Sequence, residues 1–149
     1  MLTSRFALPC LLLASVAVAT SSAFAALPGE LDTSFGGDGL VMSGFGAYGA
    51  SAEAVIQQPD GKLVVAGYVD NANPATSEKS LVLLRYNAFN GSLDTDFSGD
   101  GASIVSYGNG IRAAALARQS DGKLRAAGWT ATSTTDDVAV ARIRATGGS

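Results

Sequence analysis

Aspartate is the residue with chemical capability that recurs in this chain. Asp32 and Asp38 return as Asp94 and Asp100, each pair within Gly-x-Leu-Asp-Thr-x-Phe-x-Gly-Asp-Gly. Two carboxyl groups about 5 to 10 Å apart would suit glycoside hydrolysis. A catalytic pair is needed only once, however, and an aspartate beside glycine commonly satisfies backbone N–H groups in a turn. We therefore expect these aspartates to be structural.

The second copy of this segment adds a third carboxylate, which introduces calcium as an alternative. Asp94, Asp96 and Asp100 lie within seven residues, and Ca²⁺ binds several oxygens in a flexible loop. The first copy has Ser34 in place of Asp96, and the bidentate glutamate of an EF-hand loop is missing. Calcium binding by Asp94, Asp96 and Asp100 stays open as the weaker alternative, and no residue is assigned to a metal.

Residue types that are missing exclude several kinds of enzyme. The chain has no histidine, and its single cysteine, Cys10, lies near the N-terminus. This composition excludes Ser-His-Asp and Cys-His centres and an ordinary zinc site. The glycine-rich stretch 36–46 lacks the helix N-terminus and the lysine of a phosphate loop. The lysines, where a Ser-Lys pair would need one, lie at turns or in a loop: Lys62, Lys79 and Lys123. We expect no enzyme, no catalytic residue and no cofactor.

Two aromatic residues and a group of arginines are weaker candidates for binding. Tyr68 and Trp129 occupy equivalent positions after Ala-Gly. They would suit a sugar-binding surface, but a seam in the core is the favoured interpretation. The second half of the chain gains four arginines, which we expect to lie on a solvated face: Arg112, Arg118, Arg125 and Arg144.

The elements that position these residues come in two copies. The segment Gln58-Pro59-Asp60-Gly61-Lys62-Leu63 returns 61 residues later as Gln119-Ser120-Asp121-Gly122-Lys123-Leu124. Self-similarity at a near-fixed period is typical of repeat architectures, in which each unit needs neighbours to cover its apolar faces. We place the first repeat at about 29–90 and the second, which we expect to be truncated, at about 91–149.

Each repeat is predicted to form four short antiparallel strands. Two apolar runs around Pro59-Asp60-Gly61 predict a hairpin, because this turn presets its backbone angles. The segment 113–118 is rich in alanine and would favour helix in isolation, but its match to 52–57 predicts a strand. Smaller side chains in the second repeat predict that it opens first. The expected strands are 40–45, 52–57, 62–69 and 81–86, then 104–107, 113–118, 123–130 and 137–143.

The first 25 residues are predicted to be a cleavable signal peptide. Arg5 precedes an apolar run, and Ala23-x-Ala25 is a peptidase pattern. The run contains Pro9 and is shorter than the about 20 residues of a membrane span, so no span is expected after cleavage. The domain 26–149 is expected to be secreted, periplasmic or on the cell surface. Its 9 cations and 13 anions lack the basic footprint of a nucleic-acid-binding protein.

The recurring sequence motifs closely resemble those of the delta-60 repeat family of exported bacterial proteins. They are the aspartate-containing segment, Gln-x-Asp-Gly-Lys-Leu and Ala-Gly-aromatic, and they cover almost all of 29–149. The resemblance implies β-propeller blades and transfers no catalytic residue. Because rings close with about 4 to 8 blades, we expect an all-β fold of two four-stranded antiparallel blade-like sheets, not closed in this chain. A strand from one repeat is expected to complete the sheet of the next.

The sequence therefore predicts a non-enzymatic, exported β-repeat protein. We expect a surface or periplasmic interaction or structural module whose partner is an unknown protein or glycan, and not a nucleic acid. A carbohydrate-dependent or Ca-dependent binding module is the alternative. Open sheet edges also predict self-association.

Overall fold

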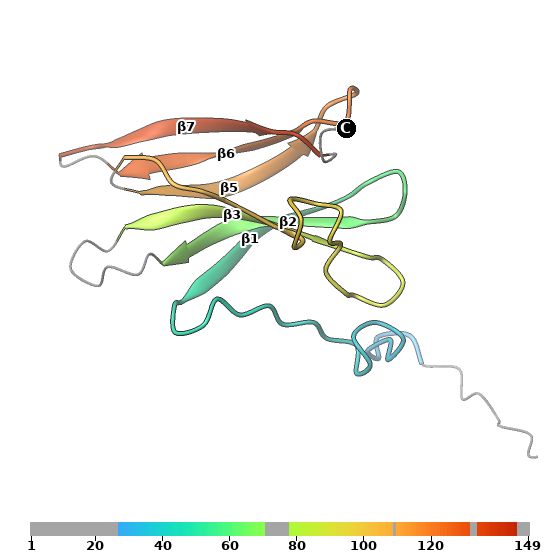
Figure 1. Ribbon diagram of the computed structural model, residues 1–149. Helices are drawn as coiled ribbons and strands as arrows, with labels where there is room; N and C mark the ends of the chain where they lie inside the picture. Colours follow the sequence, from blue (N-terminus) through green and yellow to red (C-terminus); the bar gives the residue numbers. More distant parts are fainter. Residues whose placement is uncertain (1–26, 71–77, 109, 132–133, 146–149) are drawn as a thin grey trace, which may run out of the picture.

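The computed structural model describes residues 27–70, 78–108, 110–131 and 134–145, and the predicted signal peptide lies outside them. Within these residues the chain forms seven strands and no helix, so it contains no helix that could cross a membrane. The strands make two antiparallel sheets that lie face to face (Figure 1). The expected all-β fold with two antiparallel, unclosed sheets is confirmed.

The first sheet contains four strands in the order β1-β2-β3-β4. They are β1 (Ala50–Gln57), β2 (Leu63–Asp70), β3 (Lys79–Tyr86) and β4 (Ala102–Val105). The hairpin between β1 and β2 forms at the predicted turn, where Gln58 N donates to Lys62 O over 2.8 Å and Gly61 adopts φ +85°. A side chain is rarely found at this backbone angle, which explains the glycine.

The second sheet contains three strands in the order β5-β6-β7. They are β5 (Ile111–Arg118), β6 (Leu124–Ala131) and β7 (Asp136–Ile143). The turn between β5 and β6 repeats that of the first sheet, with Gln119 N donating to Lys123 O over 2.7 Å. The alanine-rich segment 113–118 is a strand as predicted, because pairing with β6 and burial of Ala113 outweigh the helical preference of alanine.

One predicted strand is absent and another changes sheet. The segment 40–45 forms no strand and has only the isolated bridge between Phe45 and Tyr48. Its counterpart in the second repeat is β4, which pairs with β3 and so belongs to the first sheet. A strand does pass between the repeats, as expected, but it passes from the second repeat to the first sheet and not onward to the next, which leaves the second sheet with three strands instead of four. The edge strands of that sheet are β5 and β7.

The same bulge interrupts the outer hairpin of both sheets. The register of β1 on β2 shifts between Ala52 and Ala54, and that of β5 on β6 shifts between Ala113 and Ala115. Opposite each bulge lies a glycine, Gly67 or Gly128, where a Cβ atom would come within 1.8 or 1.9 Å of a backbone oxygen. The close approach of the bulged strand therefore requires glycine in Ala-Gly-aromatic.

The main core fills the space between the two sheets. Val64, Leu81 and Leu83 of the first sheet meet Leu124 and Ala126 of the second, and all are almost fully buried. A second apolar cluster covers the other face of the first sheet, where 41 and 45 pack against it. Among the described residues, no apolar cluster covers the outward face of the second sheet. Apolar burial therefore extends through the first sheet and ends at the second.

Candidate functional site

The turn that leads from β3 to β4 holds the buried carboxylate of Asp94. Asp94 N donates to Arg85 O over 2.8 Å, and Arg85 N donates to Gly101 O over 2.9 Å. Within the turn, Phe97 N donates to Asp94 O over 2.9 Å, and the side chain of Phe97 is 2% exposed. The turn is therefore fixed to β3 at both ends and by its buried aromatic ring.

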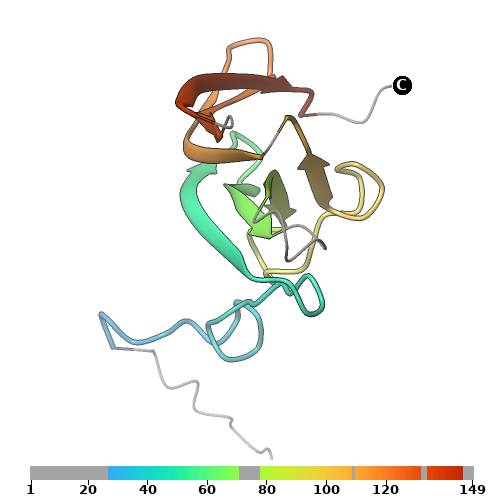
Figure 2. The same ribbon diagram turned by 90° about the vertical axis from the view of Figure 1, so that its left-hand side faces the viewer.

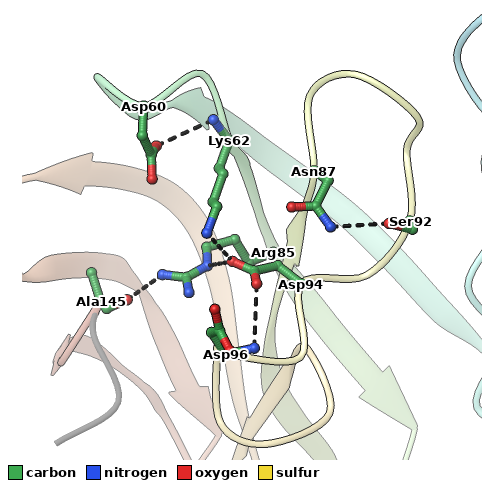
Figure 3. A network of polar contacts seen from close by, with 8 residues as sticks. All are labelled: Asp60, Lys62, Arg85, Asn87, Ser92, Asp94, Asp96 and Ala145. Atoms are coloured by element: carbon green, nitrogen blue, oxygen red, sulfur yellow. Dashed lines mark hydrogen bonds and ion pairs between the residues drawn. The ribbon is translucent and has the colours of Figure 1, made fainter. Parts of the chain in front are cut away.

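Asp94 binds two cations that come from neighbouring strands. Its Oδ2 atom lies 2.7 Å from Lys62 Nζ and 2.6 Å from Arg85 Nε, while Oδ1 accepts a hydrogen bond from Asp96 N over 3.2 Å (Figure 3). The side chains of Asp94 and Arg85 are 7% and 6% exposed. We call Lys62, Arg85 and Asp94 the ionic centre.

The surroundings of Asp94 keep it ionised. Burial acts to raise the pKa of Asp94, but the hydrogen bonds from Lys62 and from the Asp96 backbone, together with the charge of Arg85, outweigh it. The pKa of Asp94 is consequently lowered from the usual aspartate value. A carboxylate that is ionised and accepts bonds on both oxygens is poorly placed to exchange protons with a substrate.

The ionic centre also joins the two sheets. Arg85 Nη1 donates to the backbone oxygen of Ala145, just after β7 (Figure 3). The guanidinium group of Arg85 lies 4.9 Å from the centroid of the Phe97 ring, within the range of a cation–π contact. One arginine thus links β3, the Asp94 turn and the end of the second sheet, which is a structural role.

The remaining aspartates of the repeated segment cap their own turns. Asp38 Oδ1 accepts from Leu40 N, and Asp100 Oδ1 accepts from Ala102 N, both over 2.9 Å. Asp96 is exposed. Among the described residues no group of three acidic, histidine or cysteine side chains is gathered as a metal site requires. The three carboxylates considered for calcium therefore have separate roles: Asp94 pairs with cations, Asp100 caps a turn and Asp96 is exposed.

The aspartate of the first repeat does not form an ionic centre. Asp32 is exposed and accepts only from Ser34, through N over 3.0 Å and Oγ over 2.7 Å. These bonds lower the pKa of Asp32. The structure therefore separates two aspartates that are equivalent in sequence: Asp94 is buried on two cations and Asp32 lies at the surface.

The two aromatic candidates lie in a ladder of cation–π contacts. Arg112 lies between them, 5.4 Å from the Tyr68 ring and 5.7 Å from the Trp129 ring, and Lys79 lies 4.6 Å from the other side of Tyr68. Both rings are half-buried. The ladder connects β2 with β5 and β6, which supports the seam interpretation over an open sugar platform.

The lysine candidates serve as local partners of aspartates. Lys79 pairs with Asp70 across the loop between β2 and β3, and Lys123 pairs with Asp121 in the second hairpin turn. The latter contact lowers the pKa of Asp121. Lys62 belongs to the ionic centre. The glycines at 36, 37 and 39 have positive φ angles within a turn, as turn glycines do.

Two exposed apolar side chains lie on the outward face of β7. Val138 and Val140 are 88% and 67% exposed, although they belong to a regular strand. A groove of about 580 Å³ runs beside this strand and is also lined by Val105, Tyr107 and Ile111. Exposed apolar surface of this kind marks sites of contact with other molecules.

Sequence reasoning missed both the ionic centre and the β7 surface. A signal for the first was present, because Lys62, Arg85 and Asp94 all have charged counterparts in the other repeat: Lys123, Arg142 and Asp32. A charge beside buried strand residues indicates a partner of opposite charge within the fold. The β7 surface could not be foreseen while β4 was assigned to the second sheet.

Comparison with known proteins agrees with the repeat architecture. Residues 58–97 and 119–148 match the family model described as "Domain of unknown function (DUF5122) beta-propeller". The two matched stretches begin at equivalent glutamines, Gln58 and Gln119, and each includes the hairpin turn and the two strands that follow it. No curated protein and no solved structure gave a significant match. The chain is therefore similar to a β-propeller repeat family over two equivalent stretches.

Proposed function

We propose that this protein is an exported, non-enzymatic β-propeller-repeat module that acts through contact with another protein. The main observation behind the proposal is that the buried polar groups stabilise the fold. The buried carboxylate, Asp94, is neutralised by Lys62 and Arg85 and holds the chain together. The surface available for function is instead apolar and lies on β7.

Export is the second component of the proposal and depends on residues 1–25. A domain that leaves the cytoplasm without cysteine relies on packing and sheet hydrogen bonds. Mass spectrometry of the protein recovered outside the cytoplasm should find an N-terminus at Ala26. Recovery of the uncut chain from the cytoplasm alone would contradict this component.

The alternative is a carbohydrate-dependent or Ca-dependent binding module, and two measurements test it. A glycan array should show no binding, because Tyr68 and Trp129 are engaged by Arg112. Titration with Ca²⁺ should produce neither heat nor a rise in melting temperature, because Asp94 is already paired. Saturable binding in either titration would replace protein contact with that alternative.

An enzymatic function would be revealed by comparison of two asparagine variants. Asp94→Asn removes the buried carboxylate, and Asp32→Asn removes its exposed counterpart. The proposal expects both purified proteins, like the wild type, to lack turnover on glycoside and ester substrates. Turnover by the wild type that one variant abolishes without loss of melting temperature would overturn it.

A further inference from the structure

The chain contains one complete junction between a sheet edge and the strand that fills it. β4 pairs with β3 from Leu81↔Val105 to Leu84↔Ala102. The turn before β4 places Asp94 on Lys62 and Arg85. Leu81 and Leu83 are 1% and 0% exposed because the second sheet covers this face of β3. A filled edge, an ionic centre and a covered apolar face therefore occur together.

β7 presents the acceptor half of the same junction. Ile143 pairs with Leu124 as Tyr86 pairs with Leu63, so Val138, Val140 and Arg142 are the counterparts of Leu81, Leu83 and Arg85. The two valines are the most exposed apolar residues of any described strand. No described strand pairs with the outer edge of β7.

The cations of this acceptor half lack the carboxylate that the first sheet has. Arg142 is exposed and makes no ion pair within the described residues, although its charge helps to lower the pKa of Asp121, and Arg125 lies directly opposite it on β6. Like charges placed opposite each other on a sheet repel. Lys123, the counterpart of Lys62, reaches only Asp121 in its own turn. An incoming carboxylate would relieve this repulsion.

Residues 31–43 present the donor half, and their turn is already folded. Phe35 N donates to Asp32 O over 3.0 Å and Gly39 N to Phe35 O over 2.7 Å. The corresponding bonds in the Asp94 turn measure 2.9 and 2.8 Å. Asp32 nevertheless lies at the surface, and Met42 after the turn is 95% exposed. This segment thus has the shape of the Asp94 turn, but its carboxylate contacts no cation, and Val41 and Ser43 contact the first sheet of the same copy.

The two halves lie at opposite ends of the stacked sheets. Figure 1 shows residues 27–45 beyond the first sheet and β7 on the far side of the second sheet, and Figure 2 shows the same separation from another side. One copy cannot join its own two halves while its sheets remain stacked. Two copies arranged head to tail can do so.

We propose that residues 40–43 of a second copy of this chain complete the open edge of β7. The register copied from β3 and β4 pairs Val138 with Ser43, Val140 with Val41, and Ala141 with Leu40. Asp32 of the second copy would enter the site of Lys123 and Arg142. This inference rests on the proposed function as a contact module and names the partner.

Charge and shape both favour a second copy as the occupant. Three cations gather at one end of the acceptor half, Lys123, Arg125 and Arg142, while its anions are Asp136 and Asp137 at the other end of β7 and Asp121 beside Lys123; the donor half carries three anions, Glu30, Asp32 and Asp38. Apolar grooves lie on the face of the first sheet that is turned away from the second sheet, and they are lined by Val65 and Tyr86 together with Val41. The sheet face that would receive β7 is therefore already apolar.

Such an interface joins unlike surfaces and repeats from copy to copy. Interfaces of this type close into rings when the rotation permits and otherwise continue as filaments. Propellers close with about 4 to 8 blades, which two to four copies of a two-sheet chain would supply.

The first test is the oligomeric state of the purified protein and of two lysine variants. Sedimentation velocity over a range of concentrations should show oligomers for the wild type and a monomer for Val140→Lys. Ala114→Lys adds the same charge at the opposite edge of the same sheet, where the equivalent residue is the exposed Glu53, and should associate like the wild type. Melting temperatures should establish that both variants fold.

The second test removes the charge of Asp32. Asp32→Asn should weaken association at least about tenfold, whereas Glu30→Gln, which removes a charge two residues away, should have a smaller effect. High salt should weaken the wild type in the same direction. Equal effects of the two variants would contradict the assignment of Asp32 to the cationic site.

Cysteine cross-linking tests the register and polarity. In a Cys10→Ser background, a Val41→Cys chain mixed with a Val140→Cys chain should form disulfide-linked pairs, because directly opposite residues on paired strands bring their Cβ atoms to about 5 Å. Val41→Cys mixed with Val138→Cys should cross-link less. Predominant linkage between two Val140→Cys chains would overturn the head-to-tail arrangement.

The failures of the two proposals can be told apart. A monomer at every concentration, with no cross-links between mixed chains, would overturn the second copy as partner. The proposed function would survive that result, because the β7 surface would then serve a different protein. Turnover of a substrate would instead overturn the proposed function, whatever the oligomeric state.

Discussion

Replacement of Asp94 with asparagine should destabilise the protein strongly, because it leaves two cations without their shared carboxylate. Arg85 has a side chain only 6% exposed and cannot move into solvent, whereas Lys62 is 27% exposed and can turn outward. Removal of one partner from a buried ion pair costs about 3 to 5 kcal/mol. Most of this cost should come from Arg85, since exposed pairs contribute about 1 kcal/mol or less.

Thermal unfolding at neutral pH measures this effect. For a chain of this size the loss corresponds to a fall in melting temperature of roughly 10 to 20 °C. The measurement is made in the Val140→Lys background, so that self-association does not add to stability. Asp32→Asn is the matched control, because Asp32 has the same place in the repeat but only caps Ser34.

The control should lose no more than about 1 kcal/mol, the contribution of a typical hydrogen bond. Similar losses for Asp94→Asn and Asp32→Asn would refute the reasoning, because burial and pairing would then have no energetic consequence. An unchanged melting temperature for Asp94→Asn would refute it more directly. The ionic centre would in that case be dispensable for the fold.

Three further predictions concern acid, glycine and local opening. Because the pKa of Asp94 is lowered in the folded chain, its contribution is complete above the usual aspartate value of about 3.9 and is lost as the pH falls through the folded value; acid melts should show the difference between wild type and Asp94→Asn shrinking below about pH 4. Gly67→Ala and Gly128→Ala should each cost about 2 to 3 kcal/mol in denaturant titrations, because the added Cβ meets a backbone oxygen, whereas Gly44→Ala, with no atom within 4 Å, should cost less than about 0.5 kcal/mol. Hydrogen exchange should be faster in β7 than in β3, because β7 is an open edge with small side chains; equal protection of both strands in the monomer would contradict this.

The strands could largely be predicted from the sequence because the two copies support each other. The hairpin of β1 and β2 has residues that strongly favour a turn. The match between the two repeats predicted the same hairpin for β5 and β6, although these strands are rich in alanine. Propensity alone would have assigned 113–118 to helix. Internal repetition supplied the information about tertiary context that a single segment lacks.

The partner of each strand could not be predicted in the same way. Apolar periodicity shows that a segment pairs but not which sheet it joins, so the destination of β4 and the lack of a partner for 40–45 became visible only in the fold. The same limit applied to Asp32 and Asp94. Their surroundings in sequence are nearly identical, and only the presence of a filled edge beside Asp94 separates their roles.

Because β4 belongs to the second sequence repeat but to the first sheet, the boundary between the sheets does not coincide with the boundary between the sequence repeats. A cut at the boundary of the repeats, near residue 90, would remove the edge strand of the first sheet and the carboxylate that neutralises Arg85. The loop between Val105 and Ile111 is where the chain passes from one sheet to the other. Fragments for shuffling or grafting should therefore be cut in that loop and not at the repeat boundary. A fragment from 44 to 105 contains all four strands of the first sheet.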